Sequence, residues 1–235
     1  MRKRVFIFCL LAVIVAAFGY RVVRHVFLAP LLAASFRLNF NLADHTRYEA
    51  AYEALPPTQC RVLFLGDSLT AFTHWKEWFP SQNLLERGIP GEMTQGINAC
   101  LPEVCRHSPK VLVLECGINN LSRGDTPPQV VSSIQDIVTT IHRRLPQSKI
   151  VLESLYPINN RVALATNTRL RDDMNTLVLQ VNTSLKTMTG VQYVDVHSHL
   201  LDETQKLGRR YTVDGLHLTA DGYKIVVETI TPFVK

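Results

Sequence analysis

Two short motifs that lie far apart in the sequence contain a hydroxyl, an imidazole and a carboxylate. Ser68 stands in Gly66-Asp67-Ser68-Leu69, and Asp214 and His217 stand in Asp214-Gly215-Leu216-His217. A serine hydroxyl is a poor nucleophile at neutral pH, so it needs a base to take its proton, and a carboxylate fixes the tautomer of that base. Because Asp214 and His217 are three residues apart, the carboxylate can reach Nδ1 of the ring while Nε2 faces the serine. The chain order Ser68, Asp214, His217 predicts a serine hydrolase.

Each motif alone also fits a role without catalysis. Ser68 could cap a helix that follows a strand, and Asp214-Gly215 is a common turn beside which His217 could be an ordinary surface histidine. Catalysis is favoured because the same chain contains two candidate oxyanion donors, the Gly91 N–H and the Asn119 side-chain amide. Losing one such donor typically costs about 2.7–4 kcal/mol of transition-state stabilisation.

Short apolar runs that alternate with helical stretches indicate the elements that position these residues. Runs of this kind are typical of strands buried on both faces of a parallel sheet. The predicted strands are 61–66, 111–117, 150–155, 191–196 and a weaker one at 83–87, and the predicted helices are 93–106, 129–145, 163–188 and 220–233. The alternation predicts an α/β fold with a parallel five-stranded sheet and helices on both faces.

Three polar, glycine-rich loops follow these strands. They are Gly66-Asp67-Ser68, Gly88-Ile89-Pro90-Gly91 and Gly117-Ile118-Asn119-Asn120. Because the carboxyl ends of parallel strands meet at one edge of the sheet, where ligands bind, we expect the three loops to converge there. Ser68 would start the helix after its strand, so its own N–H would be a further oxyanion donor.

Composition and charge exclude two classes of protein. The chain of 235 residues is 46% hydrophobic and 19% charged, which is typical of a folded protein and not of a disordered one. Its net charge of +5 comes from the first 25 residues, which contain Arg2, Lys3, Arg4, Arg21 and Arg24 and no acidic residue. The remaining basic and acidic residues balance, so no nucleic-acid surface is expected.

The N-terminus has the layout of a targeting segment. Three cations precede the uncharged run Val5–Tyr20, as in a secretory signal with a positive region and then an apolar one. We interpret residues 1–25 as an apolar helix that is an uncleaved signal anchor, with a cleaved signal peptide as the alternative. Residues 26–57 are then a juxtamembrane helical segment, and residues 58–235 form the catalytic domain.

The four motifs occur in an order that resembles the SGNH hydrolases, also called GDSL-type esterases and lipases. They are Gly-Asp-Ser-Leu at 66–69, Arg-Gly-Ile-Pro-Gly at 87–91, Gly-Ile-Asn-Asn at 117–120 and Asp-Gly-Leu-His-Leu at 214–218. The resemblance implies a flavodoxin-like three-layer α/β/α fold, with Ser68 as nucleophile and His217 as base held by Asp214. It also implies oxyanion donors at Ser68, Gly91 and Asn119. Three positions depart from the usual pattern, Glu86, Glu92 and Asn120, and none of them is a catalytic group.

The sequence therefore predicts a serine esterase that acts through an acyl-enzyme and needs no metal or organic cofactor. Lipid esters or cell-envelope glycan esters are the expected substrates, because the predicted anchor places the catalytic domain at a membrane surface, outside the cytoplasm. If the signal is cleaved, the protein would be secreted or periplasmic instead. Two alternatives stay open: an O-acyltransferase of the same fold, and a catalytically silent binding domain for acylated glycans or lipids. The sequence does not indicate an oligomeric state.

Overall fold

The computed structural model describes residues 45–162 and 170–235. The apolar helix predicted within residues 1–25, and most of the segment 26–57, lie outside the described residues. The chain divides into two compact units, of which the second, Arg47–Lys235, contains the whole sheet. Within the described ranges, no helix is both long enough and apolar enough to cross a membrane.

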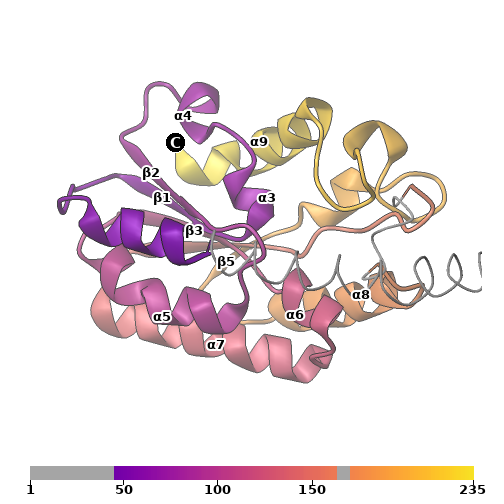
Figure 1. Cartoon of the computed structure of the whole chain (residues 1–235), viewed down its shortest axis with the longest axis horizontal. Coiled ribbons are helices and arrows are strands. Elements are labelled where there is room, and N and C mark those ends of the chain that lie inside the picture. Colours follow the sequence, from indigo (N-terminus) through magenta and orange to yellow (C-terminus); the bar gives the residue numbers. More distant parts are fainter. Residues whose placement is uncertain (1–44, 163–169) are drawn as a thin grey trace, which may run out of the picture. The chain divides into compact units, whose positions relative to one another are not determined.

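A parallel five-stranded sheet forms the centre of the second unit, with strand order β2-β1-β3-β4-β5 (Figure 1). The strands are β1 (Val62–Gly66), β2 (Leu84–Gly88), β3 (Val111–Glu115), β4 (Lys149–Glu153) and β5 (Gln192–Val194), which confirms the five predicted strands. This is the order of flavodoxin-like sheets, whose ligands bind beyond the carboxyl ends of the strands at the point where the strand order reverses. Here that point lies between β1 and β3, the strands that precede Ser68 and Asn119.

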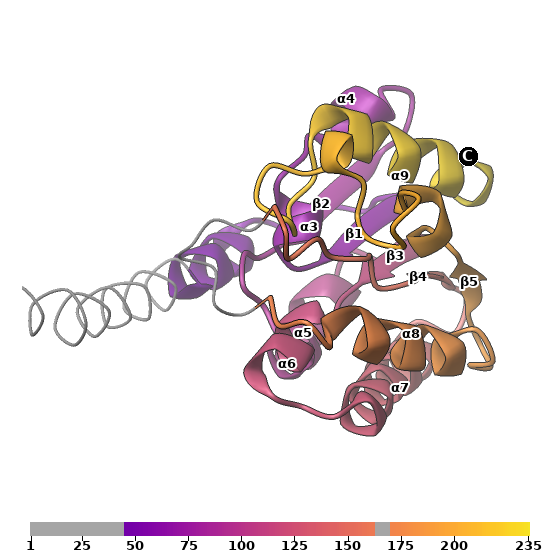
Figure 2. The same cartoon turned by 90° about the vertical axis from the view of Figure 1, so that its right-hand side faces the viewer.

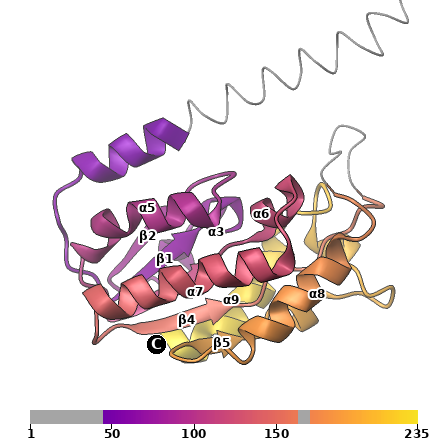
Figure 3. The ribbon, with the colours of Figure 1, turned by 90° about the horizontal axis from the view of Figure 1, so that it is seen from below.

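Helices cover both faces of the sheet (Figure 2). On one face lie α3 (Ser68–Ala71), α4 (Trp75–Trp78) and α9 (Ala220–Val234), and on the other lie α5 (Thr94–Cys105), α6 (Ile118–Arg123), α7 (Pro127–Arg144) and α8 (Met174–Leu185). Seen from below, α5, α7 and α8 lie side by side (Figure 3). Two short 3-10 helices, η2 (His197–Leu200) and η3 (Arg209–Tyr211), precede α9. Helices, sheet and helices form the three layers expected from the sequence.

The two central strands are buried along their whole length. Every residue of β1 and β3 is buried, because helices cover both faces of the sheet. Strands that are buried on both faces need apolar side chains on both, so the sequences of β1 and β3 are nearly continuous apolar runs. On the side of α4, Phe64 of β1 stacks on Trp75 with ring centroids 4.1 Å apart. Trp75 is 2% exposed. Such packing fixes the end of β1, and therefore the loop that contains Ser68.

One helix is shorter than the sequence predicts. The apolar spacing predicts a helix over 163–188, whereas α8 begins at Met174 and residues 170–173 are not helical. Two asparagines of α8 hydrogen-bond the backbone of the segment after β4: Asn175 bonds Ile158, and Asn182 bonds Leu155. These side-chain bonds fix an irregular connection that apolar periodicity does not reveal.

Candidate active site

Ser68 is the first residue of α3 and lies directly beyond the carboxyl end of β1. Asp67 caps this short helix, because its Oδ1 accepts the Leu69 N–H at 2.9 Å. The turn is tight: a Cβ on Gly66 would lie 2.3 Å from the Glu115 carbonyl oxygen, so only glycine fits there. The strand, the glycine and the cap together place Ser68 at the sheet edge that the sequence predicts. Ser68 is 5% exposed.

The three predicted triad side chains meet in one chain of contacts. Ser68 Oγ lies 3.0 Å from His217 Nε2, and His217 Nδ1 lies 2.6 Å from Asp214 Oδ2. Burial would raise the pKa of Asp214, but hydrogen bonds from the His217 ring and from backbone N–H groups hold this pKa below its ordinary value. An ionised carboxylate at Nδ1 keeps the ring proton on that nitrogen, so Nε2 is left to accept a proton from Ser68.

The loop that contains Asp214 and His217 is held by its own hydrogen bonds. Asp214 Oδ1 accepts the N–H groups of Leu216 at 3.0 Å and His217 at 2.8 Å. Gly215 has φ +90°, and a Cβ there would lie 2.3 Å from the Asn159 carbonyl oxygen. Since a side chain would meet both backbone strain and a clash, glycine is needed to bring the carboxylate and the ring together.

Gly91, a predicted oxyanion donor, lies in the loop after β2 with φ +79°, a conformation that favours glycine. Within the part of the chain that the structure describes, its N–H donates to no protein acceptor. Ser68 has no intrahelical acceptor for its own N–H, because it is the first residue of α3. Two backbone N–H groups are therefore available on loops at the same edge of the sheet.

Asn119, the third predicted donor, joins the loops. Its Nδ2 donates to Asp67 Oδ2 at 2.9 Å and to the Glu92 carbonyl oxygen at 2.9 Å. Both amide hydrogens are therefore engaged within the protein. For Asn119 to bind an oxyanion, one of these two hydrogen bonds has to be given up, a condition that the sequence does not reveal.

Asp67 of the Gly-Asp-Ser-Leu motif is not a predicted site residue, but its carboxylate binds both the Ser68 loop and Asn119. Its carboxyl is fully buried, accepts from Leu69 on one oxygen and from Asn119 on the other, and so connects the nucleophile loop to the oxyanion donor. Burial raises the pKa of Asp67 to about 6, although the hydrogen bond from Leu69 and the nearby His217 both lower this pKa. An acidic residue directly after a fully apolar strand was the available sequence signal, because such a position is buried.

Two further acids are buried at the ends of neighbouring strands. Glu115 ends β3 and is 2% exposed, and neither of its carboxyl oxygens accepts a hydrogen bond from an N–H or O–H group of the described residues. Burial, followed by the charges of Asp67 and Glu153, raises the pKa of Glu115 well above its ordinary value. Burial raises the pKa of Glu153, at the end of β4, to about 7, and the Tyr156 hydroxyl donates to it. The sequence places both residues inside predicted strands, 111–117 and 150–155, and gives no sign that they approach the site.

Asn120, one of the departures from the family pattern, has a structural role. Its Oδ1 accepts the Thr94 N–H at 3.0 Å, and its Nδ2 donates to Thr94 Oγ1 at 3.0 Å and to Asp125 Oδ2 at 2.8 Å. It therefore fixes the first turn of α5 to α6.

On the solvent side of the site, Phe72 is 53% exposed and its ring centroid lies 5.0 Å from that of His217, so the base has an apolar neighbour that substrate can reach.

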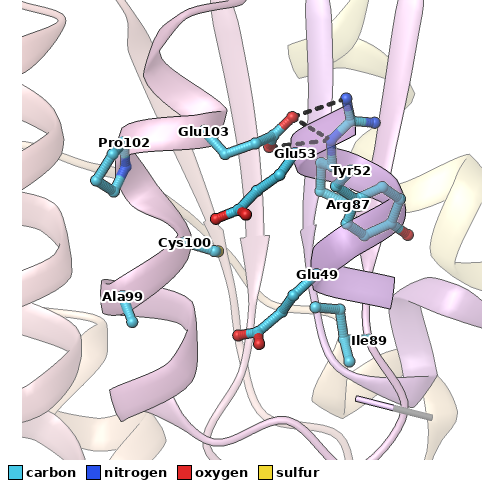
Figure 4. A pocket seen from close by; sticks show the side chains of 9 residues that line it. All are labelled: Glu49, Tyr52, Glu53, Arg87, Ile89, Ala99, Cys100, Pro102 and Glu103. Carbon is cyan, nitrogen blue, oxygen red and sulfur yellow. Dashed lines mark hydrogen bonds and ion pairs between the residues drawn. The ribbon is translucent and has the colours of Figure 1, made fainter. Parts of the chain in front are cut away.

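A separate pocket of about 260 Å³ lies away from Ser68, between residues 47–54, β2 and α5 (Figure 4). Its lining combines charged and apolar residues, and it consists of Glu49, Tyr52, Glu53, Arg87, Ile89, Ala99, Cys100, Pro102 and Glu103. Arg87 donates three hydrogen bonds to Glu103, each 3.1 Å long, and lies over the Tyr52 ring at 4.6 Å. His107 Nε2 lies 2.7 Å from the same Glu103 carboxylate. These groups attach residues 47–54 to the sheet.

Known proteins match this chain over most of its length. The model of the GDSL-like Lipase/Acylhydrolase family matches residues 64–225. The platelet-activating factor acetylhydrolase IB subunit alpha2 of Rattus norvegicus is 30% identical over 188 residues, which cover 77% of this chain and 78% of that protein. The alpha1 subunit of Homo sapiens is 28% identical over 192 residues, which cover 79% of each chain.

Solved structures share the fold. A protein from Streptococcus pneumonia, proposed to be a platelet activating factor, has a TM-score of 0.75 at 22% identity and covers 87% of this chain and 99% of its own. A GDSL-like lipase from Bacteroides thetaiotaomicron has a TM-score of 0.69 at 20% identity and covers 82% of this chain and 97% of its own.

Proposed function

The chain belongs to the GDSL-like lipase/acylhydrolase family, and from this premise we propose that it is a serine esterase that cleaves carboxylic esters through an acyl-enzyme. Ser68 is the nucleophile, His217 is the general base and then the general acid, and Asp214 orients the imidazole. The observation that carries the proposal is the 3.0 Å contact between Ser68 Oγ and His217 Nε2, made by residues from two distant segments of the chain.

The first half of the reaction forms the acyl-enzyme. Ser68 Oγ attacks the ester carbonyl while its proton passes to His217 Nε2, and the ionised Asp214 stabilises the resulting imidazolium. The negative charge that develops on the carbonyl oxygen is bound by the N–H groups of Ser68 and Gly91 and by the Asn119 amide. Of the two Asn119 hydrogens, the one that donates to the Glu92 carbonyl is the one that turns to the oxyanion, because the other is bound to a buried carboxylate.

The second half of the reaction releases the acid. The tetrahedral intermediate collapses, and the alcohol leaves with the proton from His217 Nε2. A water molecule, deprotonated by the same nitrogen, then attacks the acyl-enzyme and regenerates Ser68. Transfer of the acyl group to a sugar hydroxyl instead of water would use the same residues, so the acceptor has to be identified by product analysis.

Ser68→Ala tests the nucleophile. We expect it to lower the kcat for p-nitrophenyl acetate by about 10⁶-fold and to abolish labelling by a fluorophosphonate, which reacts with activated serines. Ser184→Ala is the matched control, because this exposed serine of α8 bonds only a carbonyl of its own helix. Undiminished turnover by a folded Ser68→Ala protein would reject the proposal. A wild-type protein that neither turns over esters nor takes the label would be the silent binding domain.

The substrate is proposed to be an acyl ester of a lipid or of an envelope glycan. The curated relatives are named acetylhydrolases of platelet-activating factor, which favours a short acyl group. A series of p-nitrophenyl esters from acetate to palmitate measures this preference by kcat/KM. Highest kcat/KM on acetate supports deacetylation, whereas a rise toward palmitate indicates a long-chain lipase.

Residues 1–25 are proposed to anchor the protein in a membrane, with the catalytic domain outside the cytoplasm. The support is their sequence, in which three cations precede the sixteen uncharged residues Val5–Tyr20. Alkaline extraction of membranes, followed by N-terminal sequencing, tests the anchor. Protein that stays in the membrane pellet with its first residues intact supports it. Release with a new N-terminus near residue 20 indicates signal cleavage instead.

A further inference from the structure

Two buried carboxyls interact directly beneath the Ser68 loop. Asp67 is 0% and Glu115 is 2% exposed. Gly66 is paired with Glu115 across the parallel strands β1 and β3, so Asp67 and Glu115 leave the same edge of the sheet. Their two carboxyls lie within hydrogen-bonding reach of each other. Because like charges in a buried site disfavour each other, the two carboxyls do not both ionise at neutral pH.

The hydrogen bonds indicate which carboxyl keeps the proton. Asp67 accepts two N–H donors, from Leu69 and Asn119, and such donors stabilise a carboxylate. Glu115 receives none from the described residues, and an unpaired buried charge is costly, so the neutral form is favoured there. The other titratable groups that act on this pair are Glu92, Glu153, Tyr156, Tyr223, Cys116 and His217. Of these, His217 alone can become a cation, and it acts on Asp67.

We propose that Glu115 is a positioning residue of the oxyanion hole, whose neutral carboxyl donates a hydrogen bond to Asp67 and thereby keeps the Asn119 amide in place. This inference rests on the proposed esterase function. The Glu115 hydroxyl has no other described partner, and a donor on Asp67 favours the ionised form that holds one Asn119 hydrogen. The second Asn119 hydrogen is then directed toward the loop that contains Gly91, where the oxyanion forms. Without the donor, Asp67 is easier to protonate and Asn119 is held less firmly.

Two substitutions of similar size separate donation from packing. Glu115→Gln retains an N–H donor for Asp67, whereas Glu115→Leu fills the space without one. We expect the Leu variant to lower kcat about tenfold with KM within twofold, less than the loss of a whole oxyanion donor, and the Gln variant to keep kcat within about twofold. The matched controls are Glu153→Gln and Glu153→Leu, because this acid accepts its hydrogen bond from the Tyr156 hydroxyl and not from Asp67. Neither control should change kcat more than about twofold.

Infrared spectroscopy detects the proton itself, without reference to activity. At neutral pH in D₂O, the wild type should show a protonated carboxylic acid band that Glu115→Gln removes. This measurement decides the proposal even if the Leu variant does not fold. Equal kcat in folded Gln and Leu variants, or no acid band lost in Glu115→Gln, would overturn the proposal. Failure of the esterase function itself would appear instead in the wild type, as absent turnover and absent fluorophosphonate labelling.

Discussion

Two of the domain's carboxylate–imidazole pairs have almost equal length but different surroundings. His217 Nδ1 lies 2.6 Å from Asp214, and His107 Nε2 lies 2.7 Å from Glu103. In the first pair the second ring nitrogen faces Ser68 Oγ at 3.0 Å. In the second pair the other ring nitrogen lies 3.0 Å from the Thr58 carbonyl oxygen and 3.1 Å from its N–H.

Exposure separates the pairs further. The side chains of His217 and Asp214 are 27% and 21% exposed, whereas those of His107 and Glu103 are 1% and 8% exposed. An imidazole can transfer protons to substrate only when one nitrogen is free of structural bonds and substrate can reach it. His107 meets neither condition. The same chemical pair is therefore suited to catalysis in one place and to fixing Arg87 of β2 and the Thr58 backbone against the end of α5 in the other.

The largest effect is expected from removing the exposed imidazole. His217→Ala should lower the kcat for p-nitrophenyl acetate by about 10⁵–10⁶-fold, because no other described base contacts Ser68 Oγ. Its melting temperature should change little, since the ring is partly exposed. His107→Gln is the comparison, and per folded molecule it should keep kcat within about twofold. A loss of kcat in His107→Gln that matched the loss in His217→Ala would erase the distinction between the pairs.

Asp214→Asn should have the next largest effect. An amide in place of the carboxylate favours the wrong ring tautomer and no longer stabilises the imidazolium, which in a comparable triad costs about 10⁴-fold in kcat. KM should stay nearly constant, because Asp214 does not contact substrate in the proposed mechanism. Steady-state kinetics on the folded variant measure both parameters. A fall of less than tenfold would show that His217 does not depend on this carboxylate.

The sequence predicted the reactive pair better than the structural one for a physical reason. Ser68, Asp214 and His217 lie in glycine-containing turns, whose local geometry is readable from neighbouring residues and which the parallel sheet brings to one edge. Glu103 and His107 are four residues apart at the end of α5, a spacing that also occurs on solvated helices. Their burial depends on packing against Tyr52 and Arg87, which sequence patterns do not reveal.

The buried acids show the same limit. Glu115 and Glu153 lie within the predicted strands 111–117 and 150–155, and in the structure they are the last residues of β3 and β4. Whether a strand-ending carboxyl turns into the site or into solvent depends on which neighbour fills the space, and this requires coordinates. The engagement of both Asn119 hydrogens is likewise visible only in the structure, because it depends on the distance between two loops.

The third prediction concerns stability and the buried pair. Glu103→Gln leaves Arg87 and His107 without their carboxylate, and removing one partner of a buried ion pair typically costs about 3–5 kcal/mol. We expect the free energy of unfolding in urea to fall by about 3 kcal/mol, while kcat of the folded protein stays unchanged. Arg210→Ala is the matched control: its ion pair with Asp221 is exposed, so the loss should stay below about 1 kcal/mol. Equal losses in the two variants would contradict a structural role for the buried cluster.

The smallest effect is a pH dependence of stability with a defined sign. Burial would raise the pKa of Glu103, but hydrogen bonds from Arg87 and His107 hold it below its ordinary value. A pKa that is lower in the folded than in the unfolded state stabilises the fold fully above the unfolded-state pKa, and this contribution is lost as the pH falls through the folded-state pKa. The stability advantage of wild type over Glu103→Gln should therefore shrink as the pH is lowered from about 5 to about 3. Asp214→Asn should show the same sign with a smaller change, because solvent screens the more exposed pair. Urea unfolding at several pH values measures both differences, and a larger change for Asp214→Asn would reverse the assignment of the two pairs.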